Sequence, residues 1–199
     1  MVSDCYGARM SEALAYVAER FQRIRRKGSG VPYLSHLLAV AGLVADHRGD
    51  EEQIIAALLH DVLEDIDGVT PSELETRFGG RVARLVVGLS DTTSRPKPPW
   101  TARKQAYLAR LRGEPADLKL ICAADKLHNA TTLLRDYGVE GDALWRRFTP
   151  TREQTLWYYR AIVASLRDGF SHPILDELEA VVLALHERVG VEPPLVDEL

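Results

Sequence analysis

Cysteine is scarce in this sequence, which contains only Cys5 and Cys122 among its 199 residues. Two cysteines so far apart cannot build a disulfide framework and do not match the paired spacing of a zinc knuckle. We therefore expect a reducing, cytoplasmic setting. No apolar run reaches the about 20 residues that cross a bilayer, and the first residues lack the apolar core of a signal peptide. A membrane partner is therefore not expected.

An excess of positive charge is also missing, because 25 lysines and arginines stand against 29 aspartates and glutamates. The formal net charge of −4 provides no basic stripe, so nucleic acid is not expected as a partner. The sequence contains no internal repeat and no low-complexity segment. Its length predicts one domain over residues 1–199, with a core at about 11–190 and a loose, proline-rich C-terminal tail.

Alternation of apolar and polar residues with a period of two, the mark of a half-buried strand, does not occur. Apolar residues recur instead at helical spacing, so we predict an all-α helical bundle of about eight to ten helices. The clearest start signals are Asp50 with Gln53 and Thr70 with Glu73, the latter with Pro71 at the first helical position. The predicted helices span about residues 11–24, 33–47, 51–65, 71–78, 81–90, 101–112, 116–136, 142–148, 151–168 and 174–189.

One apolar run ends in a cluster of polar groups: His60 and Asp61, followed one turn later by Glu64 and Asp65. Glu64 shares a helix face with His60 and Asp61, because residues three and four apart are neighbours on a helix. Carboxylates at the C-terminal end of a helix oppose its dipole, which indicates a compensating ion or basic side chain. A His-Asp dipeptide alone is common, so this stretch does not define a site by itself.

Two further helices contribute possible ligands. His36 begins one of them, and Asp125 lies among apolar residues of another, with Asn129 on the same face. A buried carboxylate is costly unless it meets a metal, a base or strong donors. The combined set of two imidazoles and two carboxylates leaves coordination positions open for water and substrate. Without thiolates it fits Mn²⁺, Fe²⁺, Zn²⁺ or Mg²⁺, and Mn²⁺ is our first choice. The four candidate ligands are His36, His60, Asp61 and Asp125.

Two loops are candidates for contacts with an anionic substrate. Residues 25–30 combine three basic side chains with two glycines, which indicates either a phosphate-binding loop or a solvated helix end. Residues 91–100 form the one long irregular stretch and contain three prolines. A loop of this length is either a lid over a site or a plain connector.

Several motifs resemble those of the RelA/SpoT alarmone enzymes, a branch of the HD-domain phosphohydrolases. Residues 27–36, KGSGVPYLSH, resemble their RKSGEPYIxH, and residues 57–65, ALLHDVLED, resemble their ALLHDxxED. Residues 78–86 resemble FGxxVxxLV, and residues 124–129, ADKLHN, resemble ADRLHN. The match runs in the same order from about residue 13 to residue 134. Because the chain is too short for a synthetase domain, it resembles the stand-alone small alarmone hydrolases.

The resemblance implies a metal-dependent hydrolase that removes the 3′-pyrophosphate of guanosine tetraphosphate (ppGpp) or pentaphosphate. The four candidate ligands would hold the metal, which would be Mn²⁺. Glu64 and Asp65 would position and activate the attacking water. The implied contacts to this small-molecule nucleotide are Lys27, Ser29, Tyr33, Lys97, Asn129, Thr132 and Arg152.

Two positions depart from the family pattern. Thr131 stands where the family has Arg after the Asn, and Leu37 stands where Pro follows the first metal-binding His. The first departure affects nucleotide contacts, so two alternatives stay open. One is a phosphatase acting on NADPH, a 3′-phosphoadenosine compound or a deoxynucleotide, and the other is a non-catalytic nucleotide sensor. The aromatic run 157–159 is expected to place at least two of its side chains in the core, and the sequence predicts no oligomeric state.

Overall fold

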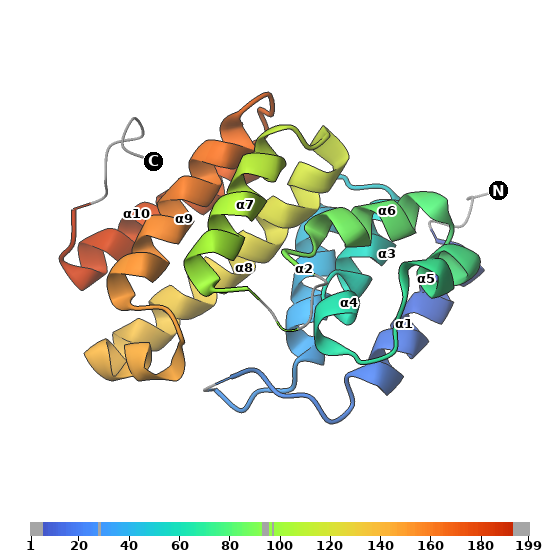
Figure 1. Cartoon of the computed structure of the whole chain (residues 1–199), viewed down its shortest axis with the longest axis horizontal. Helices are drawn as coiled ribbons and strands as arrows, with labels where there is room; N and C mark the ends of the chain where they lie inside the picture. The colour runs from blue at the N-terminus through green and yellow to red at the C-terminus, as the bar shows by residue number, and fades with distance from the viewer. Residues whose placement is uncertain (1–5, 28, 93–95, 97, 193–199) are drawn as a thin grey trace. The chain divides into compact units, whose positions relative to one another are not determined.

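The computed structural model describes residues 6–27, 29–92, 96 and 98–192. These residues form helices and no named strand, and one isolated bridge pairs Arg25 with Pro32, so the all-α prediction is confirmed (Figure 1). No helix among them is both long enough and apolar enough to cross a membrane. The helices are α1 (Ala8–Arg20), α2 (Leu34–Asp46), α3 (Glu51–Leu59), α4 (Val62–Asp65), α5 (Pro71–Phe78), α6 (Gly80–Leu89), α7 (Trp100–Arg112), α8 (Ala116–Glu140), the 3₁₀ helix η1 (Gly141–Arg147), α9 (Arg152–Arg167) and α10 (Pro173–Val189).

The chain divides into two compact units, residues 1–95 and residues 96–199. In the first unit α3 is central, since it packs against α1, α2 and α6 and residues 53–60 are all buried. In the second unit α8 packs against α9, α10 and η1, while α7 packs against α9. The prediction of a single domain over the whole chain stays a prediction. The predicted tail, 193–199, lies outside the described residues.

The predicted helix starts are confirmed where side-chain caps can be read from the sequence. The Asp50 carboxylate accepts the backbone N–H of Gln53 at 3.0 Å, and the Gln53 side chain accepts the N–H of Asp50 at 2.9 Å. The Thr70 hydroxyl likewise accepts the N–H of Glu73 at 3.2 Å, ahead of Pro71 in the first turn of α5. These caps satisfy N–H groups that have no partner within the helix.

The predicted helix 51–65 is wrong in one respect that bears on function. The helix ends at Leu59, and the short helix α4 begins at Val62, so His60 and Asp61 lie at a break. Asp61 precedes α4, and Glu64 lies in its first turn. Glu64 and Asp65 therefore belong to a separate four-residue helix that ends at Asp65, and not to the C-terminal end of α3.

Two other elements also differ from the prediction. Helix α8 continues through Gly138 and ends before Gly141, which has φ +56°, a backbone angle that glycine adopts without strain. The predicted helix at 142–148 is the 3₁₀ helix η1.

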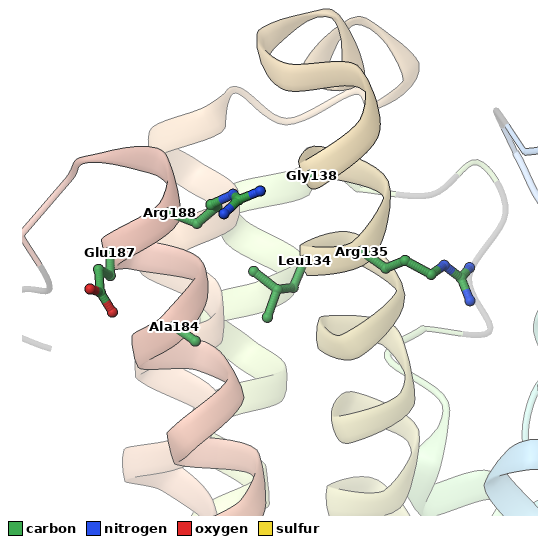
Figure 2. Close-up of a pocket in the computed structure, with 6 residues that line it drawn as sticks. All are labelled: Leu134, Arg135, Gly138, Ala184, Glu187 and Arg188. Atoms are coloured by element: carbon green, nitrogen blue, oxygen red, sulfur yellow. The ribbon is translucent and has the colours of Figure 1, made fainter.

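Helices α8 and α10 border a groove of about 700 Å³ in the second unit. Figure 2 shows Arg188 extending from α10 toward α8, whereas Arg135 and Glu187 point away from the groove. Leu134 lies nine residues after Asp125, which is about 14 Å along the helix axis at 1.5 Å per residue. No predicted site residue is among the lining residues, which are Leu134, Arg135, Gly138, Ala184, Glu187 and Arg188.

Candidate metal centre

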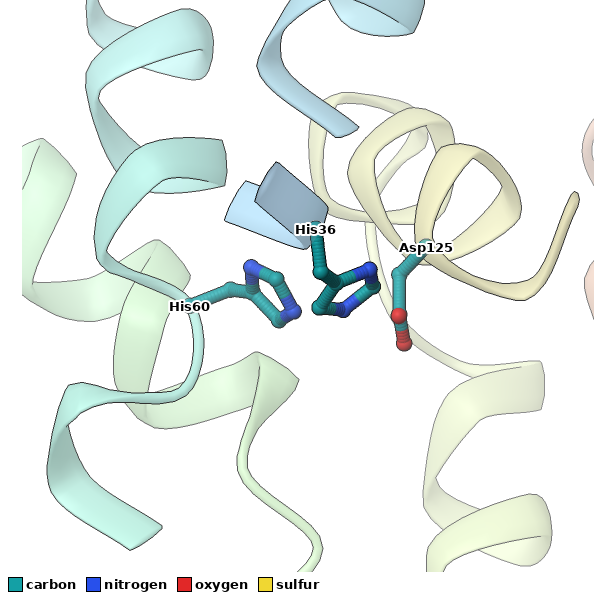
Figure 3. Close-up of side chains that lie close together, drawn as sticks. All are labelled: His36, His60 and Asp125. Carbon is teal, nitrogen blue, oxygen red and sulfur yellow. The ribbon is translucent and has the colours of Figure 1, made fainter. Parts of the chain in front are cut away.

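Three of the four predicted metal ligands meet within the first unit. Nε2 of His60 lies 2.9 Å from Oδ2 of Asp61, and Nε2 of His36 lies 3.7 Å from the same oxygen. The two imidazole rings meet edge to face, with centroids 5.1 Å apart (Figure 3, which also labels Asp125 of the second unit). Both histidines are buried, and the Asp61 side chain is 19% exposed. Two nitrogens and a carboxylate thus converge at one partly open point.

The orientation of His60 suits a metal ligand. Its Nδ1 lies 2.7 Å from the carbonyl oxygen of Ala57, which requires Nδ1 to carry the proton and donate. In that tautomer Nε2 presents a lone pair toward Asp61. Metal-binding histidines commonly donate their second ring N–H to a carbonyl in this way. The residues present therefore fit a divalent metal.

Tyr33, predicted to contact the nucleotide, lies against one of these ligands. Its hydroxyl donates to Oδ2 of Asp61 at 2.6 Å. The residue stands just before α2, and its backbone N–H donates to the carbonyl of Ile24 at 2.9 Å. The structure thus places Tyr33 in contact with a candidate ligand of the metal.

Glu64 and Asp65 lie about one helical turn after Asp61 in the sequence. The backbone N–H groups of both residues donate to the Asp61 carbonyl, at 3.1 and 2.9 Å. Oε1 of Glu64 accepts the N–H of Asp91 at 3.0 Å, which links α4 to the residue where the predicted 91–100 loop begins. Glu64 is half-buried and Asp65 is exposed. Their catalytic roles stay predictions.

Backbone hydrogen bonds hold the basic loop, residues 25–30, in a defined turn. The N–H of Arg26 donates to the carbonyl of Val31 at 2.8 Å, and the N–H of Gly30 donates to the carbonyl of Arg26 at 3.2 Å. The Arg25 guanidinium donates to the Gly30 carbonyl at 2.7 Å. The N–H of Gly30 is therefore used within the turn itself. Lys27 and Ser29 are exposed, and Gly28 lies outside the described residues.

Asp125 is buried on α8, as its apolar neighbours predict. Within the second unit its Oδ2 accepts a hydrogen bond from Nζ of Lys126 and its Oδ1 accepts one from the Asn129 amide, both at 2.6 Å. Burial acts to lower the pKa of Lys126, but the Asp125 carboxylate and neighbouring groups raise it well above its ordinary value. Sequence reasoning assigned no role to Lys126. Its position directly after an inward-pointing aspartate was the available signal.

The other predicted contacts are spread over the second unit. Thr132 is half-buried on α8. Arg152 begins α9 and pairs with Glu153 at 2.8 Å. Lys97 lies outside the described residues. Of the aromatic run, Tyr158 and Tyr159 are buried and Trp157 is half-buried, which confirms that two of the three belong to the core.

A family model described as an HD domain matches residues 13–150. The chain belongs to the HD-domain family. This confirms the resemblance indicated by the motifs, and the matched region includes residues of both units.

Two related proteins share one name, which describes a hydrolysis reaction. The zebrafish (Danio rerio) protein "Guanosine-3′,5′-bis(diphosphate) 3′-pyrophosphohydrolase MESH1" is 39% identical over 128 residues, which cover 62% of this chain and 68% of that protein. The human protein of the same name is 35% identical over 131 residues, covering 64% and 71%.

A solved structure supports the same relationship. It is described as a metazoan ortholog of SpoT that hydrolyses ppGpp, and it is 27% identical to this chain with a TM-score of 0.75. The match covers 96% of this chain and 100% of that one. A second structure, lmo0812 from Listeria monocytogenes, is 28% identical with a TM-score of 0.69, covering 76% and 99%.

Proposed function

We propose that this HD-family chain is a metal-dependent phosphohydrolase that removes pyrophosphate from the 3′ position of ppGpp. The observation that carries the proposal is the convergence of His36, His60 and Asp61 in a chain that is 39% and 35% identical to two proteins named for that reaction. We also propose a cytoplasmic location, in keeping with the low cysteine content.

Asp125 would be the fourth ligand of the metal. It is buried, as are His36 and His60, and each of the three offers one ligand atom. The mixed nitrogen and oxygen donors favour Mn²⁺ as the ion. When bound, such an ion supplies Lewis-acid polarisation of a phosphoryl oxygen and lowers the pKa of water.

Glu64 would be the general base. It lies one turn from Asp61, and the N–H of Asp91 restrains one of its carboxylate oxygens. It would take a proton from the attacking water as the water oxygen bonds to phosphorus. The bond from phosphorus to the ribose 3′ oxygen then breaks, and that oxygen takes up a proton. The products are pyrophosphate and guanosine diphosphate, with Asp65 helping to orient the water.

The polyphosphate would be bound by cationic and polar side chains. Lys27 and Ser29 are exposed in the basic turn, where their groups can meet phosphate oxygens. Asn129 already uses one N–H on Asp125 and would contact the nucleotide through its other amide atoms. Three further residues are retained as proposed phosphate or nucleotide contacts: Lys97, Thr132 and Arg152.

A substrate panel tests the proposal. Purified protein with Mn²⁺ is incubated separately with ppGpp, NADPH, a 3′-phosphoadenosine compound and a deoxynucleoside triphosphate, and the products are identified by mass. We expect pyrophosphate and guanosine diphosphate from ppGpp, and no product from the Asp61→Asn variant. If another compound is hydrolysed and ppGpp releases no pyrophosphate, that compound replaces ppGpp as the proposed substrate. Tight ppGpp binding without turnover in metal-loaded protein would favour the sensor alternative.

A further inference from the structure

Tyr33 makes a close contact with a proposed metal ligand. Its phenol oxygen lies 2.6 Å from Oδ2 of Asp61, within the range of short hydrogen bonds between a hydroxyl and a carboxylate. We propose that Tyr33 is a positioning residue that holds the Asp61 carboxylate in the orientation required for metal binding. The proposal rests on the metal site of the proposed function.

The Tyr33 ring is held in place on two sides. Phe21, which is buried, stacks on it with centroids 5.3 Å apart and an angle of 18° between the planes. His36 meets the ring edge to face at 5.5 Å. The backbone is anchored as well, since the N–H of Tyr33 donates to the carbonyl of Ile24 in the segment between α1 and α2. The direction of the hydroxyl is therefore set before any metal or substrate arrives.

Asp61 needs such a restraint because of where it lies. It occupies the break between α3 and α4, and its side chain remains 19% exposed. The Tyr33 hydroxyl contacts the oxygen that also lies nearest to His60 and His36. Rotation of the carboxylate would carry that oxygen away from the imidazoles. Loss of a hydrogen bond to a metal ligand typically weakens metal affinity 10- to 100-fold.

This role differs from the direct nucleotide contact that the sequence motif implies. A phenol has one proton to donate, and here it is donated to Asp61. Phe21 covers one face of the ring. Tyr33 therefore acts on metal affinity first, and its removal should change the substrate KM little once the metal is saturating.

The Tyr33→Phe variant isolates the hydroxyl, since it keeps the ring that packs on Phe21 and His36. Tyr16→Phe is a matched control in the same unit, because the Tyr16 hydroxyl donates to a carboxylate oxygen of Glu73 at 2.9 Å and its ring packs against Phe78. Mn²⁺ binding is measured by titration calorimetry without substrate. We expect affinity to fall by about 10- to 100-fold in Tyr33→Phe and to stay unchanged in Tyr16→Phe.

A second measurement covers the case in which Tyr33→Phe does not fold. Mn²⁺ added to the wild-type protein should perturb the ultraviolet absorbance of a tyrosine, and the Tyr16→Phe variant should retain that change. Equal Mn²⁺ affinity in Tyr33→Phe and wild type would overturn the proposal, as would the absence of any tyrosine signal. If Tyr33→Phe binds Mn²⁺ more weakly and the wild-type protein does not hydrolyse ppGpp, the role of Tyr33 in metal binding stands and only the proposed reaction is refuted.

Discussion

Asp61 and Glu64 are acidic residues of the same short segment, but their side chains make different contacts and we propose different roles for them. Asp61 meets two imidazoles and a phenol, so its carboxylate belongs to the metal cluster. Oε1 of Glu64, one turn after Asp61, accepts the backbone N–H of Asp91. Substitution of the acid by its amide should therefore abolish metal binding at Asp61 and leave it unchanged at Glu64.

Glu64→Gln should retain the metal and lose turnover. The amide oxygen can still accept the N–H of Asp91, but an amide cannot take a proton from water, so the rate should fall by roughly 10²–10⁴. Metal content and ppGpp hydrolysis are measured together, with Glu75→Gln on α5 as a control that should match wild type. Loss of metal in Glu64→Gln would make Glu64 a ligand.

Asp61→Asn should lose both metal and turnover, because it removes the anionic donor that faces His36 and His60. Bound Mn²⁺ is quantified after gel filtration, and turnover is assayed on the same sample. A variant with full activity and bound metal would show that Asp61 is not a ligand.

At the scale of elements, the turn between α1 and α2 carries basic side chains, and its backbone N–H and carbonyl groups form hydrogen bonds with each other. Its cations are therefore presented by side chains, and Lys27 is exposed. Arg26→Ala combined with Lys27→Ala should raise the ppGpp KM, and this effect should shrink as salt screens the charges. Arg23→Ala, an exposed arginine just before the turn, should match wild type. A KM equal to wild type at low and high salt would make the turn a solvated helix end.

Helices α7 and α9 are joined by a buried lysine. Nζ of Lys119 donates to the carbonyl of Arg112 at 2.9 Å and also to the carbonyl of Asp168, at the C-terminal ends of these helices. Its side chain is almost fully buried. The ammonium group thus satisfies carbonyls that have no partner within their own helices.

Lys119→Met should destabilise the protein by on the order of 3 kcal/mol, since it removes a charged donor from two carbonyls. For a chain of this length, the melting temperature should fall by roughly 6–12 °C in thermal denaturation. Lys27→Met, at an exposed position, should change it by only a degree or two. Equal melting temperatures for the two variants would show that Lys119 contributes little to stability.

At the scale of the whole molecule, metal binding should appear as stability. An ion that binds only the folded chain adds about 2.7 kcal/mol when it is present at 100 times its dissociation constant. Mn²⁺ should therefore raise the melting temperature by roughly 5–11 °C over protein treated with chelator. Asp61→Asn should show no such shift. An equal rise in that variant would place the stabilising ion elsewhere.

Much of the fold could be predicted because its signals are local in the sequence. Helical stripes, the Asp50 and Thr70 caps and the start of α10 each depend on residues within about one turn of each other. Boundaries that depend on distant packing were predicted less well. The predicted helix 116–136 stops short of Gly138, but α8 continues through this residue, because packing against α10 and η1 outweighs the roughly 1 kcal/mol that glycine costs in a helix.

The sequence by itself determined the helical class, the family and the chemical types of the candidate ligands, because periodicity, caps and motifs are properties of short stretches. Only the tertiary structure decided how those ligands are held. The side chain of His60 bonds to the Ala57 carbonyl at the helix break, and Tyr33 reaches Asp61 across 28 positions of the chain. Contacts between residues so far apart depend on how α2 packs against α3, and no local pattern encodes that packing.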